Sequence, residues 1–128
     1  MDFSDNTQES AFRAEVRTFI AENAPQHLAE YLEKSGFGST NTGPHDRLEE
    51  AKKWQKTKAE AGWACLLWPT EYGGRGASPI ENVIWSQEEG LFSKLSGTFI
   101  IGQGMCAPTM MAFAGEEHKQ RYLPKLEW

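Results

Sequence analysis

The 128-residue chain has few cysteines and histidines, the residues that form disulfide bonds or bind metal ions in small domains. Its two cysteines, Cys65 and Cys106, are not at C-x-x-C spacing and are too few for a disulfide framework. We therefore expect two buried, reduced thiols in a cytoplasmic protein. The three histidines, His27, His45 and His118, lie in polar segments, and none is at ligand spacing from a Cys, Asp or Glu on one helix face. The sequence thus predicts no metal site and solvent-exposed histidines.

Positive charge is also scarce. The chain has 13 Lys and Arg against 18 Asp and Glu, which gives a formal net charge of -5 at pH 7. Nucleic acids and anionic membrane surfaces are bound by clustered Lys and Arg, so this balance argues against both partners. Residues 1–5 are acidic and lack an apolar core, which predicts no signal peptide there.

Formal charge of either sign is absent from residues 95–115. A membrane-spanning helix needs about 20 predominantly apolar residues. This run contains Ser96, Gly97 and Gln103 and is interrupted by Pro108, which removes a backbone donor and kinks or breaks a helix. We therefore expect a buried helix pair, broken or kinked near Pro108, rather than a membrane span.

Catalytic motifs are lacking as well. No G-x-S-x-G nucleophile turn occurs anywhere in the sequence. Glu88 and Glu89 are adjacent acids near the end of a predicted helix, and the preferred interpretation of both is a solvated face or pairing at the helix end. The residues by themselves therefore predict no catalytic site.

What the chain does contain is apolar bulk with helical periodicity. Hydrophobic residues make up 39% of it, including five Trp and seven Phe, which is enough for the core of one domain over residues 1–128. Helical spacing of apolar residues predicts helices over 7–23, 46–61 and from 79 to about 92, a short helix around 28–32 and a charged helical turn at 116–121. Glycines predict a loop over 36–43. No segment predicts a strand, so we expect an all-α orthogonal bundle of about five or six helices.

Residues 62–77 form an ordered connection between two of these helices. Gly62 suits the end of the preceding helix. The segment carries its own apolar anchors, followed by glycines that permit backbone angles other residues avoid. These residues are Trp63, Leu66, Leu67, Trp68 and Tyr72, and then Gly73, Gly74 and Gly76.

A sharply defined helix start comes after this connection. Ser78 is placed as an N-cap, Pro79 as the first helical residue and Glu81 as the partner in a capping box. A glycine-rich turn before a helix can also cradle a phosphate group. However, the dinucleotide-binding pattern needs a glycine where Pro79 stands, and no strand precedes the turn. A structural turn is therefore the favoured interpretation.

Gly102 and Gly104 leave space inside the uncharged run and cost helix stability. That space admits either a neighbouring helix or a ligand, and periodicity alone favours helix packing. The residues thus predict an all-α domain with one candidate apolar pocket.

Six local motifs succeed one another along the chain, and in this order they resemble the N-terminal helical domain of acyl-CoA dehydrogenases. The resemblance covers nearly the whole chain, with departures at Ala114-Gly115 and Glu127-Trp128. The motifs are a first helix ending near Pro25, Gly62-Trp63, Trp68-Pro69-Thr70-Glu71-Tyr72-Gly73-Gly74-Arg75-Gly76, the helix start at 78–81, Ala107-Pro108-Thr109 and Tyr122-Leu123-Pro124.

The resemblance implies a part of an FAD enzyme that introduces an α,β double bond into acyl-CoA thioesters. In that family a middle β-domain and a C-terminal helical bundle come after the N-terminal domain and hold most flavin contacts and the catalytic carboxylate. The resemblance therefore implies that both of these are absent here, that no residue of this chain is catalytic, and that FAD is bound only in the full-length enzyme. Acyl-CoA, an electron-transfer partner and further copies of the chain are its implied partners.

The resemblance also implies that helices of this domain wall one side of the acyl cavity. The matching positions are Gly97, Thr98, Ile101, Gly102 and Met105, and the small ones suit a long, branched or polycyclic acyl group. The alternative is a non-catalytic helical interaction or oligomerisation module that kept this fold.

Overall fold

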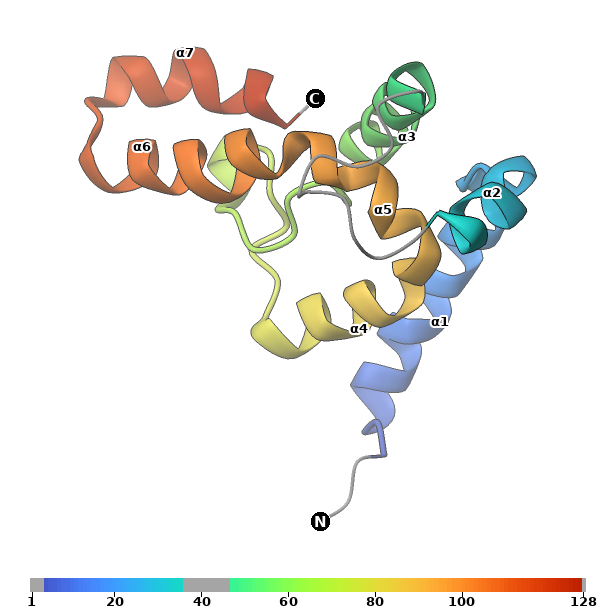
Figure 1. Ribbon diagram of the computed structural model, residues 1–128. Coiled ribbons are helices and arrows are strands. Elements are labelled where there is room, and N and C mark those ends of the chain that lie inside the picture. Colours follow the sequence, from blue (N-terminus) through green and yellow to red (C-terminus); the bar gives the residue numbers. More distant parts are fainter. Residues whose placement is uncertain (1–3, 36–46, 128) are drawn as a thin grey trace.

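The computed structural model describes residues 4–35 and 47–127, and every regular element in those two ranges is helical. The predicted all-α class is therefore confirmed, whereas the loop expected at 36–43 lies outside the described residues. The α-helices are α1 (Thr7–Asn23), α2 (Ala29–Lys34), α3 (Leu48–Glu60), α4 (Pro79–Glu89), α5 (Ser93–Ser96), α6 (Ala107–Phe113) and α7 (Glu116–Leu126) (Figure 1). Short 3-10 turns occupy Gln26–Leu28, Thr70–Tyr72, Gly90–Phe92 and Gly97–Phe99.

Side-chain caps determine where α1 and α4 begin. The side chain of Asn6 accepts from the Glu9 amide at 2.8 Å, and the Glu9 carboxylate accepts from the Asn6 amide at 2.9 Å. Ser78 and Glu81 form the same reciprocal pair at the start of α4, as the sequence predicts. Because these bonds satisfy amides that a helix leaves unpaired, both helices start at sequence-defined positions.

The main core lies where α1, α3 and α4 meet. Aromatic rings dominate it: the Trp63 and Trp85 ring centroids lie 5.0 Å apart at an interplanar angle of 13°, and Phe19 contacts both rings. Such pairs add about 0.5–1.5 kcal/mol beyond the burial of their area. The other buried members are Val16, Ile20, Ala24, Leu28, Leu32, Ala51, Trp54, Leu66, Phe92 and Leu95.

A second, smaller core joins the connection to the C-terminal helices. Cys65, Trp68 and Tyr72 from the connection are buried against Ala107 of α6 and Leu123 of α7. Figure 1 shows α6 and α7 side by side as a hairpin at one end of the molecule, with α1 and α4 at the other. Residues 62–77 therefore belong to both cores and hold the two halves of the domain together.

The glycine turn within this connection is tightly folded on itself. A Cβ atom at Gly74 would lie 2.1 Å from the Trp68 carbonyl oxygen. The Gly76 amide donates to that same oxygen at 2.9 Å, and the Gly74 amide donates to the Pro69 carbonyl oxygen at 3.2 Å. These amides are used inside the protein and the start of α4 is capped, so the turn has the structural role that the sequence favours.

A four-residue ionic brace ties the middle of α1 and the residue Asp5 before it to the end of α4. Arg13 pairs with Asp5 and, at 2.7 Å, with Glu88, whose second carboxylate oxygen lies 2.8 Å from Arg17. Arg17 and Arg13 hold the pKa of Glu88 below its ordinary value of 4.5, and Arg13 likewise lowers the pKa of Asp5. Both carboxylates are therefore more easily ionised in the folded chain than in the unfolded chain.

We expect this brace to make the domain acid-sensitive. A carboxylate whose pKa is lowered by folding stabilises the fold above its unfolded pKa and loses that contribution as the pH falls through the folded value. The unfolding midpoint should therefore drop as the pH is lowered from about 4.5, and the drop should be smaller in Glu88→Gln. Denaturant titrations from neutral to acid pH measure this, with the exposed Glu22→Gln on α1 as control. Equal acid sensitivity of all three proteins would refute the brace.

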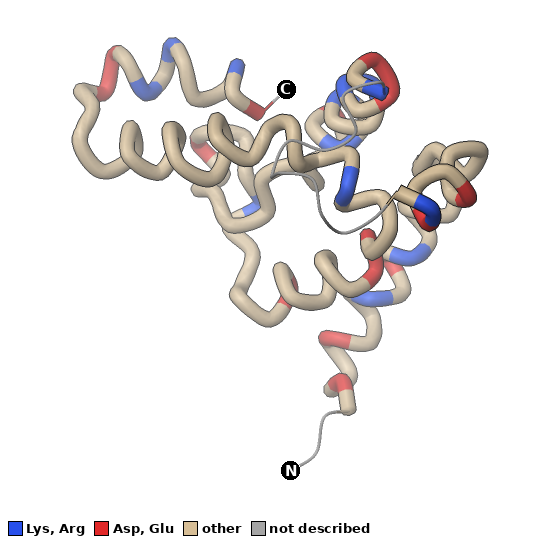
Figure 2. Tube along the Cα trace, viewed as in Figure 1, with Lys and Arg blue, Asp and Glu red and all other residues tan. Residues whose placement is uncertain are grey.

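The uncharged run at 95–115 departs from its prediction. It is not a buried helix pair, because Ile100, Ile101, Met105 and Phe113 are 49%, 59%, 65% and 86% exposed. The chain stays helical through Pro108 and changes its winding earlier, in a π-helical turn at Gly102–Cys106. The prediction failed because the run is packed from one side only, by the connection and α7. Figure 2 shows this run as a continuous stretch without Lys, Arg, Asp or Glu.

Three further expectations can be compared with the structure. Cys106 is exposed rather than buried because it lies on the open side of the π-helical turn, whereas Cys65 is buried as expected. His27 and His118 are exposed, and His45 lies outside the described residues. No helix in the described ranges is long and apolar enough to cross a membrane.

Candidate ligand-binding cavity

A cavity of about 580 Å³ lies between the connection, α4 and the chain from α5 to the π-helical turn. This volume is within the roughly 300–1,000 Å³ of small-molecule sites. We refer to it as the central cavity. Its lining residues are Ala64, Cys65, Leu66, Leu67, Trp68, Asn82, Ser86, Ser93, Ser96, Gly97, Ile100, Gln103 and Gly104.

The π-helical turn shapes one wall of the central cavity. In this turn the Ala107 amide donates to the Gly102 carbonyl oxygen, five residues back. Pro108 has no amide hydrogen and cannot continue the normal ladder. Isolated π-turns of this kind are frequent at functional sites. The turn presents Gln103 and Gly104 to the cavity.

The structure separates the five residues that the sequence assigned to the acyl wall. Gly97 lines the central cavity, but Thr98, Ile101, Gly102 and Met105 do not. A Cβ atom at Gly102 would lie 3.6 Å from Leu126 of α7, so Gly102 faces another helix. Ile101 and Met105 point to the open outer side of the same run, where both are more than half exposed.

The cavity-lining members of this run are instead Gly97, Ile100, Gln103 and Gly104. The spacing of residues 97, 100 and 104 is that of one helical face. Helical periodicity counted from Gly97 would have identified Ile100 and Gly104. Gln103 lies three residues after Ile100 and fits the same spacing.

A buried ionic network lies beneath the central cavity. The Glu89 carboxylate accepts from Lys58 Nζ at 2.8 Å and from the indole nitrogens of Trp54 and Trp85, each at 3.1 Å. Lys58 Nζ also donates to Ser96 Oγ at 2.7 Å. Glu89 is therefore not on a solvated face, which was one of its two predicted roles; it pairs at the end of α4 with a lysine that lies 31 residues earlier in the chain.

Cys65 offers the cavity a thiol but not a nucleophile. Burial, together with the nearby Glu127 carboxylate, raises the pKa of Cys65 to about 12. Because the thiolate is the reactive form, the side chain stays inert near neutral pH. Cys65 therefore gives the central cavity no reactive nucleophile near neutral pH.

Two glutamines fix the C-terminal end of α7 against this wall. The Gln55 and Gln103 amide nitrogens both donate to the Glu127 carbonyl oxygen, at 2.6 Å and 3.1 Å. The Glu127 side chain is itself buried, and burial raises its pKa. Its Oε1 and the Oε1 of Gln55 have no hydrogen-bond partner among the described residues.

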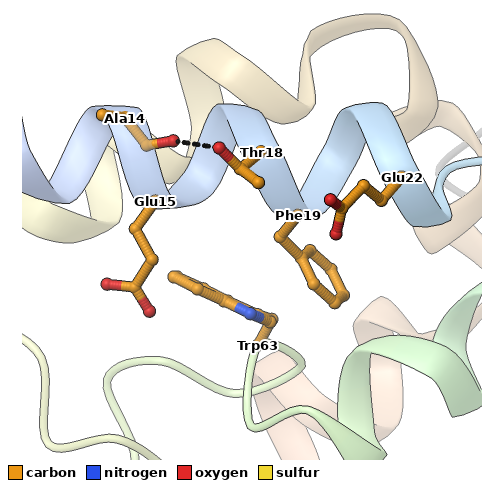
Figure 3. A pocket seen from close by; sticks show the side chains of 6 residues that line it. All are labelled: Ala14, Glu15, Thr18, Phe19, Glu22 and Trp63. Atoms are coloured by element: carbon orange, nitrogen blue, oxygen red, sulfur yellow. Dashed lines mark hydrogen bonds between the residues drawn. The ribbon is translucent and has the colours of Figure 1, made fainter.

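A second pocket, of about 460 Å³, opens beside α1 (Figure 3). Figure 3 shows the rings of Phe19 and Trp63 there, with the Glu15 and Glu22 carboxylates to either side. The aromatic surface is already used: the Arg75 guanidinium lies 3.6 Å from the Trp63 ring centroid and 3.2 Å from Glu15. This contact fixes the end of the glycine turn, so we interpret the pocket as structural.

The described ranges lack the residue groups that metal ions need. They contain no group of three or more His, Cys, Asp or Glu residues that could hold a metal ion. The described residues form an all-α domain with a cavity of small-molecule size between its elements.

Comparison with known proteins identifies the family to which this all-α domain belongs. The sequence model of the "Acyl-CoA dehydrogenase, N-terminal domain" matches residues 6–127. The chain therefore belongs to the acyl-CoA dehydrogenase family.

The relatives are longer than this chain. The "Acyl-CoA dehydrogenase IpdE1" of Mycolicibacterium smegmatis is 32% identical over 115 residues, which cover 90% of this chain and 28% of that protein. The chain spans a similar share of solved structures. The ChsE4-ChsE5 complex from Mycobacterium tuberculosis matches with a TM-score of 0.67 and 25% identity over 99% of this chain and 29% of that one. The structure described as "Tcur3481-Tcur3483 steroid ACAD" matches with a TM-score of 0.62 and 26% identity, over 99% and 30%.

Proposed function

We propose that this chain is the N-terminal helical part of an FAD-dependent acyl-CoA dehydrogenase and that its central cavity forms one wall of the acyl site. The observation that carries the proposal is a cavity of small-molecule size in a chain that matches the family over residues 6–127. Gly97 and Gly104 leave that wall open, and Leu66 and Trp68 give it an apolar floor. Such a surface suits an acyl chain.

The described residues do not fit a flavin phosphate site. Members of this family are generally FAD-dependent. In this chain, however, amides of the glycine turn donate to carbonyl oxygens of the same turn, and Ser78 caps the start of α4, so these groups are not available to a phosphate. No carboxylate lines the central cavity to serve as a base. The proposal therefore assigns the flavin site and the base to parts of the longer family members outside the region that this chain matches. We expect the chain by itself to be colourless and inactive towards acyl-CoA.

A bulky acyl group is the proposed substrate class. Glycines at 97 and 104 widen the cavity, and one structural relative is described as a steroid acyl-CoA dehydrogenase. Two of the matching structures contain two named subunits each, which supports an oligomer built from acyl-CoA dehydrogenase chains. An electron-transfer partner belongs to the same proposal.

Two glycines on one run test the position of the acyl wall. A Cβ atom at Gly104 would meet only Ile100, at 3.8 Å, so Gly104→Leu should place its side chain in the central cavity. Gly102→Leu is the matched control because its side chain faces α7. In NMR titrations of the chain with cholanoyl-CoA, a polycyclic acyl thioester, Gly104→Leu should weaken binding at least about tenfold, which corresponds to roughly 1.4 kcal/mol.

Gly102→Leu and Gly104→Leu distinguish the central cavity from the acyl wall predicted from the sequence, because each assignment expects a different variant to lose binding. Gly102→Leu should bind the thioester like the original chain, with reduced stability where its side chain overpacks Leu126. Free coenzyme A serves as the second control, since it lacks the acyl group. Loss of binding in Gly102→Leu alone would return the site to the set predicted from the sequence. Failure of the acyl thioester to bind at all would refute the proposed function.

The second candidate function is a helical interaction module. It is favoured by Ile101, Met105 and Phe113, which expose apolar side chains along the outer side of one helical run. Contiguous apolar surface of this kind marks interfaces in soluble proteins. In this case sedimentation should show self-association that Met105→Glu abolishes, while acyl thioester binding stays undetectable.

A further inference from the structure

The hydrogen-bond donors on the polar side chains that line the central cavity are, with one exception, already used within the protein. Ser86 Oγ donates to the Asn82 carbonyl oxygen at 2.9 Å, and Ser93 Oγ donates to the Gly90 carbonyl oxygen at 2.6 Å. Each of these two hydroxyl groups therefore already donates its single hydrogen to a backbone carbonyl oxygen nearby in the chain.

The other polar groups of the wall are engaged in the same way. Ser96 Oγ accepts from Lys58 at 2.7 Å and donates to Glu89 at 3.3 Å. The Gln103 amide nitrogen donates to the carbonyl oxygens of Leu126 and Glu127, at 3.3 Å and 3.1 Å. Neither side chain has a donor left for a bound molecule without giving up one of these contacts.

Asn82 is the exception. It lies on α4, one turn before Ser86, and it lines the cavity in a partly buried position. Its carboxamide has two N–H donors and one oxygen acceptor, and none of these makes a hydrogen bond to another described residue. In the free domain, water can satisfy this group. A molecule that fills the cavity must displace that water.

We propose that Asn82 is a specificity-determining residue, which selects acyl groups that carry a hydroxyl or carbonyl oxygen on a bulky ring system. This inference rests on the proposed function of the central cavity. An oxygen on the bound group replaces the water that the carboxamide loses. A purely hydrocarbon group of the same shape leaves the carboxamide desolvated and unpaired, which weakens binding. Selection therefore comes from a penalty on the hydrocarbon as much as from attraction to the oxygen.

The partial exposure of Asn82 limits the size of the effect. A net hydrogen bond between uncharged groups contributes about 0.5–1.5 kcal/mol, which corresponds to a preference of roughly twofold to tenfold. Larger factors need a fully buried group, which Asn82 is not.

The test compares two thioesters that differ by a single ring hydroxyl group, lithocholoyl-CoA and cholanoyl-CoA. Their dissociation constants are measured by NMR titration of the chain and of Asn82→Leu and Ser86→Ala. The chain should prefer the hydroxylated probe about fivefold, Asn82→Leu should lose the preference while keeping or gaining affinity for the hydrocarbon probe, and Ser86→Ala should keep it. Asn82→Ala is the second variant, so that a folding defect of the leucine variant does not decide the outcome.

The outcomes separate this inference from the function on which it rests. If both probes bind at the central cavity with equal affinity, or if the asparagine variants keep the preference, Asn82 is not the selecting residue and the acyl site stands. If neither probe shifts the resonances of Gly97 and Gly104, the acyl site itself is refuted, and the inference with it. Loss of the preference in Ser86→Ala instead would move the selecting group to Ser86.

Discussion

Gly74→Ala is expected to lose about 3 kcal/mol or more of unfolding free energy, at the upper end of what overpacking costs. The reason is the distance of 2.1 Å between a Cβ atom at this position and the Trp68 carbonyl oxygen. The obstacle is backbone, which cannot rotate away as a flexible side chain can. Relief requires the turn to open, and opening breaks the 2.9 Å bond from the Gly76 amide to the same oxygen.

Gly104→Ala is the matched control for this prediction. Its added methyl group would meet only Ile100, at the ordinary contact distance of 3.8 Å, and alanine is the better helix former. Denaturant unfolding of both variants, monitored by circular dichroism, should show a large loss for Gly74→Ala and an unchanged or raised midpoint for Gly104→Ala. Similar midpoints for the two variants would mean that the turn is looser than its geometry indicates.

The effect should reach both halves of the domain. The connection places Trp63 and Leu66 in the main core, and Trp68 and Tyr72 in the core that contacts α6 and α7. A turn that opens at Gly74 therefore displaces anchors from both cores. Unfolding of this variant should remain a single transition at a lower denaturant concentration, because neither half has a complete core without the connection.

Local signals made most of the helices predictable. The start of α4 is determined by Ser78, Pro79 and Glu81, and the end of α1 by Pro25, because caps and prolines act over three or four residues. These determinants are read directly in the sequence. The same is true of the tight turn at Gly74, although the atom it protects, the Trp68 carbonyl oxygen, is visible only in the structure.

The burial of the uncharged run was not predictable in this way. An uncharged helical run can be covered by other parts of the protein on all sides or on one side, and the absence of charge does not distinguish the two cases. Leu95 and Ala107 face the two cores, whereas Ile101 and Met105 are exposed. The burial of Glu89 was not predictable for a related reason: a carboxylate is expected at the surface unless its partner is known, and Lys58 lies on a different helix.

The five residues predicted for the acyl wall lie on the same run as part of the central cavity, and their role stays a prediction. The sequence chose residues 97, 98, 101, 102 and 105, and of these only Gly97 lines the central cavity. Thr98 and Ile101 precede the π-helical turn at Gly102–Cys106, so their absence from the lining depends on which face of the run the connection and α4 cover. Asn82 and Ser86 were missed because they come from α4, which only the folded chain brings beside this run.

Lys58→Met should destabilise the domain by about 3–5 kcal/mol, which is the cost of breaking one partner out of a buried ion pair. The side chains of Lys58 and Glu89 are 4% and 7% exposed, so almost no water is available to solvate the carboxylate that remains. The indole nitrogens of Trp54 and Trp85 still donate to it, but neither carries a charge. Denaturant unfolding of the single variant measures the loss directly.

The double variant Lys58→Met with Glu89→Gln distinguishes a lost charge partner from lost packing. Glutamine keeps an oxygen acceptor for an indole donor while removing the buried charge, so most of the stability should return even though two native side chains are gone. If the double variant is as unstable as the two single variants combined, shape rather than charge is what Lys58 contributes. Ser96 connects this network to the wall of the central cavity through its 2.7 Å contact with Lys58. Lys58→Met should therefore also weaken acyl thioester binding under conditions in which the chain is still folded. The double variant should regain stability, but it should not regain the Lys58–Ser96 contact.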